Sequence, residues 1–300
     1  MNFLVTGAWQ CNEEQLNNIR AMGHEVFFMQ NEKEHCPVEY DWVEGVICNG
    51  LFLHHNIEEF KNLRYIQLTS AGFDRVDVQH INDHGIALYN VRGVYSIPMA
   101  EYSLCGVLQL LKNTRFFDNN QKEHQWMKKR DVVELCGKNV CIVGCGNVGT
   151  ECAKRFNAFG CNVFGVDLYP RQDEYYSVIY PLQDLKKALA DAFITVLTLP
   201  LTEESRHIIN SDVLSSLPTG AIIVNIARGG VVDTQALINA LSNGKLGGAV
   251  LDVFEDEPLD TASPLWEMDN VIVTPHNSFV GDGNAQRLND VIMANLRGNQ

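Results

Sequence analysis

The sequence predicts an α/β protein with two domains, each built on a doubly wound parallel β-sheet. Apolar, strand-like segments alternate with helical segments twice along the chain, once before residue 92 and again after residue 138. The length of 300 residues also exceeds what one ordinary core requires. We therefore expect residues 1–92 together with 282–300 to form a smaller domain, and residues 93–281 to form a larger one.

The first series of segments predicts the smaller domain. Leu16 and Ile19, for example, lie on one face of a predicted helix. Strands are expected at residues 2–6, 24–29, 45–48, 65–69 and 86–91, and helices at residues 13–22, 57–63 and 76–83. Because strands and helices alternate, the sheet should be parallel with helices on both faces.

A long helix is predicted next, over residues 96–117. Ser96 suits the N-cap, and Pro98 lies in the first turn, where its missing N–H costs nothing. Apolar side chains recur at steps of three and four residues from Ile97 to Leu111. Such a helix could bridge two domains or form a subunit interface.

The second series begins at residue 139 and predicts the larger domain. Strands are expected at residues 140–143, 162–167, 194–197, 221–226, 248–253 and 271–273, and helices at residues 148–159, 182–190 and 234–243. We expect a last helix, over residues 284–296, to cross back and pack on the first domain.

Composition restricts the partners and the location. The chain carries 23 basic and 37 acidic residues, a formal net charge of −14, which disfavours nucleic acid as a partner. No apolar stretch is long enough to cross a bilayer, and the N-terminus lacks the features of a signal peptide. Nine scattered cysteines suggest free thiols in a reducing compartment, so we expect a cytoplasmic protein without disulfides. Cys141 on a strand and Cys145 in a glycine loop favour packing over zinc, and no metal site is expected.

A glycine-rich loop predicts a dinucleotide site. Residues 144–149 read Gly-Cys-Gly-Asn-Val-Gly, between an apolar strand and an amphipathic helix. Gly144 allows the tight turn, Gly146 lets the backbone approach a pyrophosphate, and Gly149 allows close contact between helix and strand. The N–H groups of Asn147 and Val148 open the helix and can face the phosphates.

An acidic residue follows about twenty residues after this loop, as the dinucleotide fold requires. Asp167 ends the next predicted strand, where its carboxylate can accept hydrogen bonds from the adenosine ribose and repel a 2′-phosphate. This favours NAD over NADP. Arg171, four residues further on, could reach such a phosphate, so the preference for NAD stays open to test.

Three further segments carry a family resemblance. They are residues 224–233, which include Val-Asn-Ile-Ala-Arg-Gly-Gly, residues 251–258, which read Leu-Asp-Val-Phe-Glu-Asp-Glu-Pro, and Thr274-Pro275-His276. In this order, after a dinucleotide loop, the chain resembles the D-isomer-specific 2-hydroxyacid dehydrogenase family along almost its whole length. The resemblance implies a smaller flavodoxin-like substrate domain and a Rossmann domain that binds NAD. It also implies hydride transfer between NAD(H) and a small 2-keto or 2-hydroxy acid.

The resemblance assigns roles to three residues, and each role suits its side chain. Arg228 is expected to bind the substrate carboxylate and polarise its carbonyl, because a planar guanidinium grips both groups better than a lysine does. His276 is expected to donate the proton in reduction and accept it in oxidation. Glu257 resembles the partner carboxylate that orients the imidazole and stabilises its protonated form.

Further positions are implied less directly. Ser70, Ala71 and Gly72 resemble a substrate loop whose backbone N–H groups face the carboxylate. Further cofactor contacts are implied for Leu199, Pro200, Ala227, Asp252 and His276. The chain departs from the family pattern at Arg92, Phe279 and Gly281, which puts the shape of the substrate pocket in doubt. Arg92 and Tyr95 could shape substrate choice or brace the segment between the domains.

Other functions fit parts of the sequence. Oxidation of formate or phosphite is argued against by Glu257, because formate-oxidising relatives typically have Gln there. An NAD(H)-sensing binding protein or corepressor without turnover would retain the same motifs, although the acidic charge disfavours it. A redox or metal protein lacks a spaced ligand set among the cysteines. Since family members usually pair through the helix at residues 96–117, we also expect a homodimer.

Overall fold

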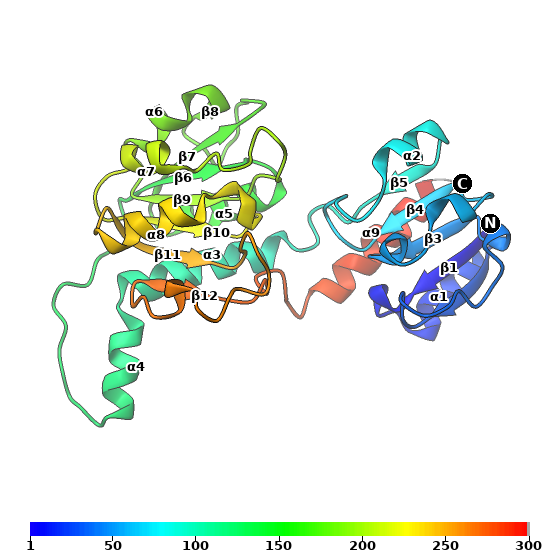
Figure 1. Ribbon diagram of the computed structural model, residues 1–300, viewed down its shortest axis with the longest axis horizontal. Helices are drawn as coiled ribbons and strands as arrows, with labels where there is room; N and C mark the ends of the chain where they lie inside the picture. Colours follow the sequence, from blue (N-terminus) through cyan, green and yellow to red (C-terminus); the bar gives the residue numbers. More distant parts are fainter. Residues whose placement is uncertain (299–300) are drawn as a thin grey trace. The chain divides into compact units, whose positions relative to one another are not determined.

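The computed structural model describes residues 1–298, which divide into two compact units (Figure 1). One unit contains Met1–Tyr95 and the chain from Gly281 onward, and the other contains Ser96–Val280. Each unit is built on a parallel sheet, as the sequence predicts. The functional division, with a substrate domain at 1–92 and 282–300 and a dinucleotide domain at 93–281, stays a prediction.

The first unit contains a five-stranded parallel sheet in the order β2-β1-β3-β4-β5. Its strands are β1 (Asn2–Thr6), β2 (Glu25–Met29), β3 (Gly45–Cys48), β4 (Tyr65–Leu68) and β5 (Ala87–Tyr89), and its helices are α1 (Glu13–Ala21), α2 (Val78–Asp83) and α9 (Asn284–Gly298). The strands β1, β3 and β4 are almost fully buried, because apolar cores lie on both faces of the sheet. Helix α9 contributes Leu288, Ile292 and Leu296 to one core, so the last helix packs on the first unit as expected.

Local side-chain chemistry explains where helices of this unit begin. A reciprocal capping box starts α1, since Asn12 accepts from the Gln15 N–H at 3.0 Å while the Gln15 side chain accepts from the Asn12 N–H at 2.8 Å. The predicted helix at residues 57–63 is wrong, because only Ile57–Glu59 forms a short 3₁₀ turn. The backbone leaves the helical region at Phe60, whose ring is buried in the core instead.

The second unit contains a seven-stranded parallel sheet in the order β12-β11-β10-β9-β6-β7-β8. Its strands are β6 (Asn139–Val143), β7 (Asn162–Asp167), β8 (Ile179–Pro181), β9 (Ile194–Leu197), β10 (Ala221–Asn225), β11 (Leu246–Leu251) and β12 (Val271–Val273). Its helices are α3 (Ser96–Leu111), α4 (Thr114–Lys122), α5 (Asn147–Ala158), α6 (Leu185–Leu189), α7 (Ser211–Ser216) and α8 (Thr234–Ser242). The short elements β8 and α7 were not predicted from the sequence.

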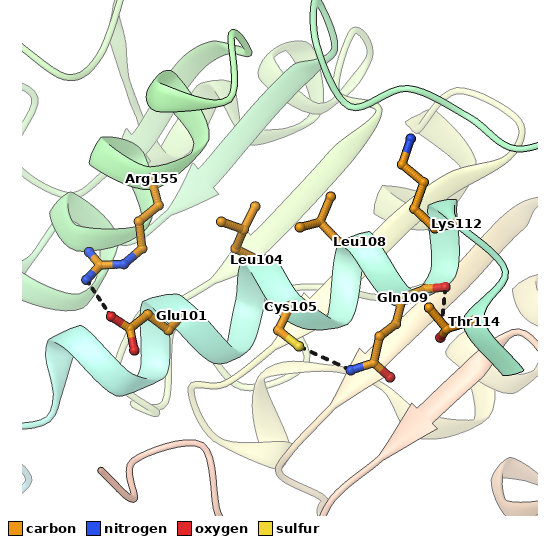
Figure 2. A pocket seen from close by; sticks show the side chains of 8 residues that line it. All are labelled: Glu101, Leu104, Cys105, Leu108, Gln109, Lys112, Thr114 and Arg155. Atoms are coloured by element: carbon orange, nitrogen blue, oxygen red, sulfur yellow. Dashed lines mark hydrogen bonds and ion pairs between the residues drawn. The ribbon is translucent and has the colours of Figure 1, made fainter. Parts of the chain in front are cut away.

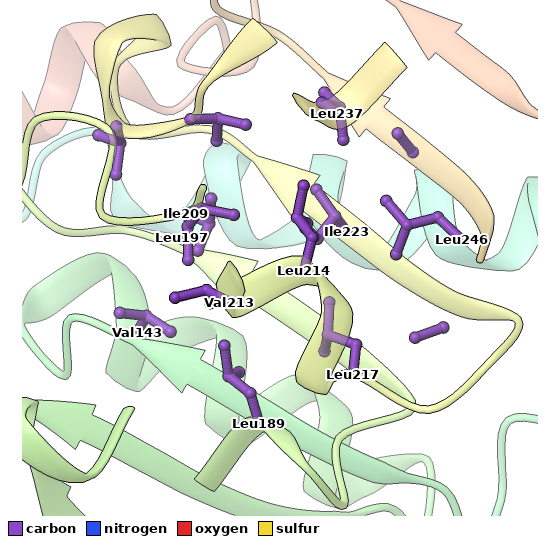
Figure 3. Packing of buried hydrophobic residues seen from close by; sticks show 14 of the residues in the cluster. Val143, Leu189, Leu197, Ile209, Val213, Leu214, Leu217, Ile223, Leu237 and Leu246 are labelled. Carbon is purple, nitrogen blue, oxygen red and sulfur yellow. The ribbon is translucent and has the colours of Figure 1, made fainter. Parts of the chain in front are cut away.

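Helices cover both faces of this sheet. On one face, apolar side chains of α6, α7 and α8 pack with the strands, and Figure 3 shows Leu189, Leu214 and Leu237 in that cluster. On the other face, α3 and α5 bury residues such as Val107 and Phe156. This double cover explains why the central strands read as continuous apolar runs.

The long helix predicted over residues 96–117 is in fact two helices. Helix α3 ends at Leu111, and Asn113 adopts a left-handed conformation with φ of 53° before α4 begins. Helix α4 extends away from the sheet of its unit (Figure 1). Among residues 1–298, no helix is both long enough and apolar enough to cross a membrane.

Candidate functional site

The predicted cofactor and catalytic residues of the second unit all follow the carboxyl ends of its strands. The glycine loop follows β6, Asp167 ends β7, Arg228 follows β10 and His276 follows β12. The strand order reverses between β6 and β9, and such a switch point is where open parallel sheets bind ligands. The sheet topology therefore brings these loops to one edge.

The geometry of the glycine loop fits a dinucleotide. A side chain at Gly144 would lie 2.7 Å from the Leu199 backbone nitrogen, and its φ is +97°, so the turn requires glycine. A side chain at Gly149 would lie 2.2 Å from the Gly144 carbonyl oxygen, which explains the close approach of α5 to β6. At Gly146 nothing lies within 4 Å, so space is open beside the first turn of α5, whose N–H groups have no partner within the helix. An anionic pyrophosphate suits this position.

Asp167 anchors the glycine loop. Its Oδ2 accepts from the Cys145 N–H at 2.7 Å, and its Oδ1 accepts from the Tyr169 N–H at 2.9 Å. Each oxygen keeps a further lone pair, so the carboxylate can still accept from ribose hydroxyls. Arg171 donates to the Cys145 carbonyl and lies 3.5 Å from Asp173, so a cation also lies at this loop.

The Arg228 loop is held by hydrogen bonds of the Asn225 side chain and by close backbone packing at Gly229. The buried Asn225 accepts from the Ala227 N–H at 3.1 Å and donates to the Arg228 carbonyl at 3.2 Å. The Arg228 guanidinium donates to the Ala227 carbonyl at 2.8 Å. A side chain at Gly229 would lie 1.8 Å from the carbonyl carbon of Phe254, so this loop rests directly on the chain that leaves β11.

His276 and Glu257 form a hydrogen-bonded pair. His276 Nδ1 lies 2.9 Å from Glu257 Oε2, and the two side chains are 42% and 37% exposed, so solvent or a substrate can reach them. Glu257 Oε1 accepts from the Phe254 N–H at 3.1 Å, which fixes the carboxylate. With Nδ1 engaged, Nε2 is the atom that can exchange a proton with a ligand. His276 has a φ of +51°, a conformation that needs support from its surroundings.

Asp252 provides that support, a role the sequence analysis missed. The side chain is fully buried, yet Oδ1 accepts from Thr274 Oγ1 at 2.6 Å and from the Asn277 N–H at 2.7 Å. Oδ2 accepts from the Ser278 N–H at 2.9 Å, and the Asp252 carbonyl accepts from the His276 N–H at 2.7 Å. Asp252 therefore fixes the loop on both sides of His276. The signal in the sequence was weak: an acidic residue directly after an apolar strand, at a position where the chain is expected to be buried.

In the first unit, the predicted substrate loop follows β4. Its carbonyl groups are engaged: Thr69 accepts from Tyr95 Oη at 2.6 Å, Ser70 from the Val91 N–H at 3.2 Å, and Ala71 from Asn90 Nδ2 at 2.6 Å. Within residues 1–298, the N–H groups of residues 70–72 donate to no protein acceptor. The loop therefore presents donors that an anion could accept from.

Several other residues that the sequence analysis names are placed as follows. Tyr95 braces the substrate loop through its hydrogen bond to Thr69, whereas the Arg92 side chain is exposed. Phe279 lies edge-on to His276, with ring centroids 6.2 Å apart. Leu199 is buried against the glycine loop, and Pro200 is exposed beside it.

The cysteines form no obvious alternative centre. All nine are free thiols, and burial raises the pKa of Cys145 to about 12, so its thiol is neutral and unreactive at ordinary pH. In the described part of the chain, no cluster of three histidine, cysteine or acidic side chains could hold a metal ion.

Comparison with known proteins places this geometry in context. Residues 104–278 match the model of the D-isomer specific 2-hydroxyacid dehydrogenase, NAD binding domain. The chain is 36% identical to a D-3-phosphoglycerate dehydrogenase of Methanocaldococcus jannaschii over 73% of this chain, although the match spans only 42% of that relative. It is 34% identical to a glyoxylate reductase of Thermofilum pendens over 78% of this chain and 71% of that relative.

Solved structures agree in fold over almost the whole chain. A D-isomer specific 2-hydroxyacid dehydrogenase from Xanthobacter autotrophicus, in complex with NADPH and MES, has a TM-score of 0.79 and 29% identity, covering 99% of this chain and 93% of its own. A D-lactate dehydrogenase from Aquifex aeolicus, complexed with NAD and lactic acid, has a TM-score of 0.79 and 26% identity, covering 99% and 96%.

Proposed function

The chain belongs to the D-isomer specific 2-hydroxyacid dehydrogenase family, and from this premise we propose that it transfers a hydride between NAD(H) and a small 2-keto or 2-hydroxy acid of the D configuration. The observation that carries the proposal is the His276–Glu257 pair, at 2.9 Å, on the same sheet edge as Arg228 and the glycine loop. Acid–base, anion-binding and dinucleotide-binding groups are the parts that this reaction needs.

His276 is proposed as the proton donor in reduction and the acceptor in oxidation. Glu257 accepts from Nδ1–H and so fixes the tautomer that leaves Nε2 for the substrate oxygen. In reduction, Nε2–H gives its proton to the oxygen that becomes a hydroxyl. The carboxylate then lies beside a neutral ring, and in the reverse direction it stabilises the imidazolium that forms.

Arg228 is proposed to bind the substrate carboxylate and to polarise the adjacent carbonyl. A guanidinium offers two parallel N–H donors, which match one carboxylate oxygen and the adjacent carbonyl oxygen of a 2-keto acid. We propose the N–H groups of Ser70, Ala71 and Gly72 as further donors to the carboxylate, because they have no protein acceptor within residues 1–298.

Members of this family bind NAD or NADP, and we propose NAD for this chain because Asp167 places a negative charge where a 2′-phosphate would lie. The bound nicotinamide supplies or accepts the hydride. Contacts to the cofactor are assigned to Gly144, Gly146, Asn147, Val148, Gly149, Leu199, Pro200, Ala227, Asp252 and His276. The open space at Gly146 and the N-terminus of α5 fit the pyrophosphate.

We further propose that two copies pair through helix α3. A groove of about 390 Å³ runs along this helix, with Leu104, Cys105 and Leu108 between the charged residues Glu101 and Lys112 (Figure 2). Beyond α4, Trp126 is 97% exposed and Met127 is 54% exposed. Apolar surface of this kind is typical of a protein interface.

The free thiols suit a cytoplasmic location, which we also propose.

The test is oxidation of NADH and NADPH, followed at the nicotinamide absorbance, with glyoxylate, hydroxypyruvate, pyruvate and phosphohydroxypyruvate. We expect turnover with NADH on at least one of them, reduced by a factor of about 10² or more in His276→Ala and Arg228→Ala. Asp256→Asn, at an exposed neighbouring position, is the control. Binding of NADH without turnover on any acid would instead support an NAD(H)-sensing binding protein or corepressor.

A further inference from the structure

A second histidine–carboxylate pair lies close to the proposed catalytic pair. His207 Nε2 lies 2.7 Å from Glu255 Oε2, and the side chains are 42% and 30% exposed. The two residues are 48 positions apart in the sequence, so the fold alone brings them together. None of the roles proposed above uses them.

Each member of this pair is attached to a loop that carries a functional side chain. The backbone N–H of His207 donates to the Gly230 carbonyl at 2.8 Å, two residues after Arg228. Glu255 lies two residues before Glu257, and its Oε1 accepts from the Thr234 N–H at 2.9 Å, at the start of α8. The pair therefore joins three segments: the chain after β9, the Arg228 loop and the Glu257 loop.

The two functional loops also touch each other at this point. A side chain at Gly229 would lie 1.9 Å from the Phe254 carbonyl oxygen and 2.3 Å from the Glu255 backbone nitrogen. The preceding N–H, that of Phe254, donates to Glu257 Oε1 at 3.1 Å. Because backbone packs against backbone here, a shift of Glu255 would move Gly229 and also change the support of the Glu257 carboxylate.

The local chemistry keeps the pair formed. Burial raises the pKa of Glu255, but hydrogen bonds from Thr234 and His207 outweigh burial, so the pKa of this carboxyl group is lower than its usual value. His207 has a φ of +50°, a left-handed conformation that directs its side chain from a tight turn. A partly exposed histidine–carboxylate contact contributes little to stability by itself. The pair is important instead because it connects the Arg228 loop with the Glu257 loop.

We propose that His207 and Glu255 are positioning residues that hold Arg228 and Glu257 in the arrangement needed for catalysis. The inference rests on the proposed function, because it concerns the residues that bind the 2-keto acid and orient His276. Positioning errors of this kind lower turnover and substrate binding while they leave the dinucleotide loop, on the other side of β9, untouched.

The test compares His207→Asn, Glu255→Ala and the double variant with the wild type. Asparagine tolerates the left-handed backbone but is too short to reach Glu255, so His207→Asn removes the contact without straining the turn. Lys186→Gln is the matched control, because it breaks an exposed ion pair elsewhere in the same unit, Lys186–Asp212 at 2.8 Å.

We expect each single variant to lower kcat/KM for the keto acid about 10- to 100-fold, with a lower kcat and a higher KM. The dissociation constant for NADH and the melting temperature should match those of Lys186→Gln. If the pair acts as a unit, the double variant should be no worse than the poorer single variant. Losses that multiply in the double variant, or losses no larger than in Lys186→Gln, would overturn the proposal.

A second measurement does not need turnover. The imidazole resonances of His276 in NMR spectra should move in His207→Asn and Glu255→Ala but not in Lys186→Gln, because Glu257 changes its support. If the wild type reduces no keto acid and these resonances move, the proposed reaction is wrong and the positioning role is retained. If the wild type is active and neither kcat/KM nor the resonances change, the positioning role is wrong.

Discussion

The carboxylate of Asp252 shows how one buried residue can determine the position of another. Three donors from residues 274–278 converge on its two oxygens, and its backbone carbonyl holds the His276 N–H. A buried anion is tolerated only when such donors surround it. The conformation of His276, at a positive φ, therefore depends on the hydrogen bonds that Asp252 accepts.

Replacing Asp252 with Asn should destabilise the fold and slow the reaction. Asparagine can keep the oxygen that faces Thr274 and Asn277, but its amide group would then face the Ser278 N–H, and two donors cannot pair. We expect a loss of about 1–3 kcal/mol in the free energy of unfolding, measured in urea, together with a lower kcat. The exposed Asp256→Asn serves as control, and an unchanged kcat in Asp252→Asn would contradict this role.

Asp167 should control the choice between NADH and NADPH. Its negative charge disfavours a 2′-phosphate, whereas Arg171 lies at the same loop and can interact with one. In Asp167→Ser, the ratio of kcat/KM for NADH to that for NADPH should fall at least about tenfold, because the negative charge that repels the 2′-phosphate is removed. Glu174→Ser is a control for general loss of negative charge. A ratio that stays constant would place the selectivity elsewhere.

The proposed catalytic residues could be identified as candidates in the sequence because, in the proposed mechanism, their own side chains carry the chemistry. Arg228, Glu257 and His276 lie in short contiguous motifs, so their types and spacing are visible in the sequence. Asp252 and the His207–Glu255 pair make contacts between residues that are 22 to 48 positions apart in the sequence. Such contacts are set by how strands are ordered in the sheet, which local periodicity does not specify.

At the scale of elements, segments with a clear apolar pattern could be predicted, even when they are short, and segments without one could not. Strands such as β3 and β7 were predicted at their observed bounds. The three-residue strand β8 has one buried residue and two half-buried ones, so it gives no clear alternation. The break between α3 and α4 was missed, although Asn113, which follows the last apolar residue of α3, is a residue type that can end a helix.

The turn at Asn113 should be sensitive to the residue there. With a φ of 53°, the backbone is left-handed, which glycine and asparagine accept and other residues resist. Asn113→Ala should lower the free energy of unfolding by about 1 kcal/mol, and Asn113→Gly should have a smaller effect or none. Urea denaturation measures both. Equal effects of alanine and glycine would show that the side chain, and not the backbone conformation, matters.

The loop between β11 and η7, the 3₁₀ turn Pro264–Trp266, should respond to pH through Glu255. Its pKa is lower in the folded chain, so the ionised carboxylate stabilises the fold above the usual Glu value of about 4.3, and this contribution disappears as pH falls through the folded pKa. Glu255→Gln should therefore be less stable than the wild type at pH 7, and the difference should shrink only below about pH 4, as pH falls through the lowered pKa of Glu255. Urea unfolding at several pH values checks this, with Glu203→Gln as the control. A difference that is constant with pH would contradict it.

At the scale of the whole molecule, each unit places its candidate residues at the carboxyl ends of its own parallel sheet. The first unit offers backbone N–H donors in residues 70–72, and the second offers a cation, an acid–base pair and a dinucleotide loop. The proposed roles suit these groups chemically: a carboxylate can be bound by neutral donors, whereas proton transfer and hydride transfer require groups at fixed mutual positions.

The net charge of −14 bears on the proposed homodimer. Two such chains repel each other, so pairing needs an apolar contact or locally placed cations to offset the repulsion. The groove along α3 has both, with Leu104 and Leu108 beside Lys112 and Arg155 (Figure 2). If the long-range repulsion dominates, salt should strengthen the dimer by screening it.

Introducing a charge into this groove should separate the copies. Leu108→Asp would place an unpaired carboxylate in the contact and add to the negative charge of each chain, so we expect a monomer in sedimentation velocity where the wild type is a dimer. Leu53→Asp is the matched control, because Leu53 is 60% exposed and lies in the other unit. For the wild type, the dimer dissociation constant should fall as salt rises from 50 to 500 mM, because salt screens the repulsion between the two negatively charged chains. A wild type that is monomeric at all concentrations would refute the homodimer, and a Leu108→Asp protein that stays dimeric would move the interface away from α3.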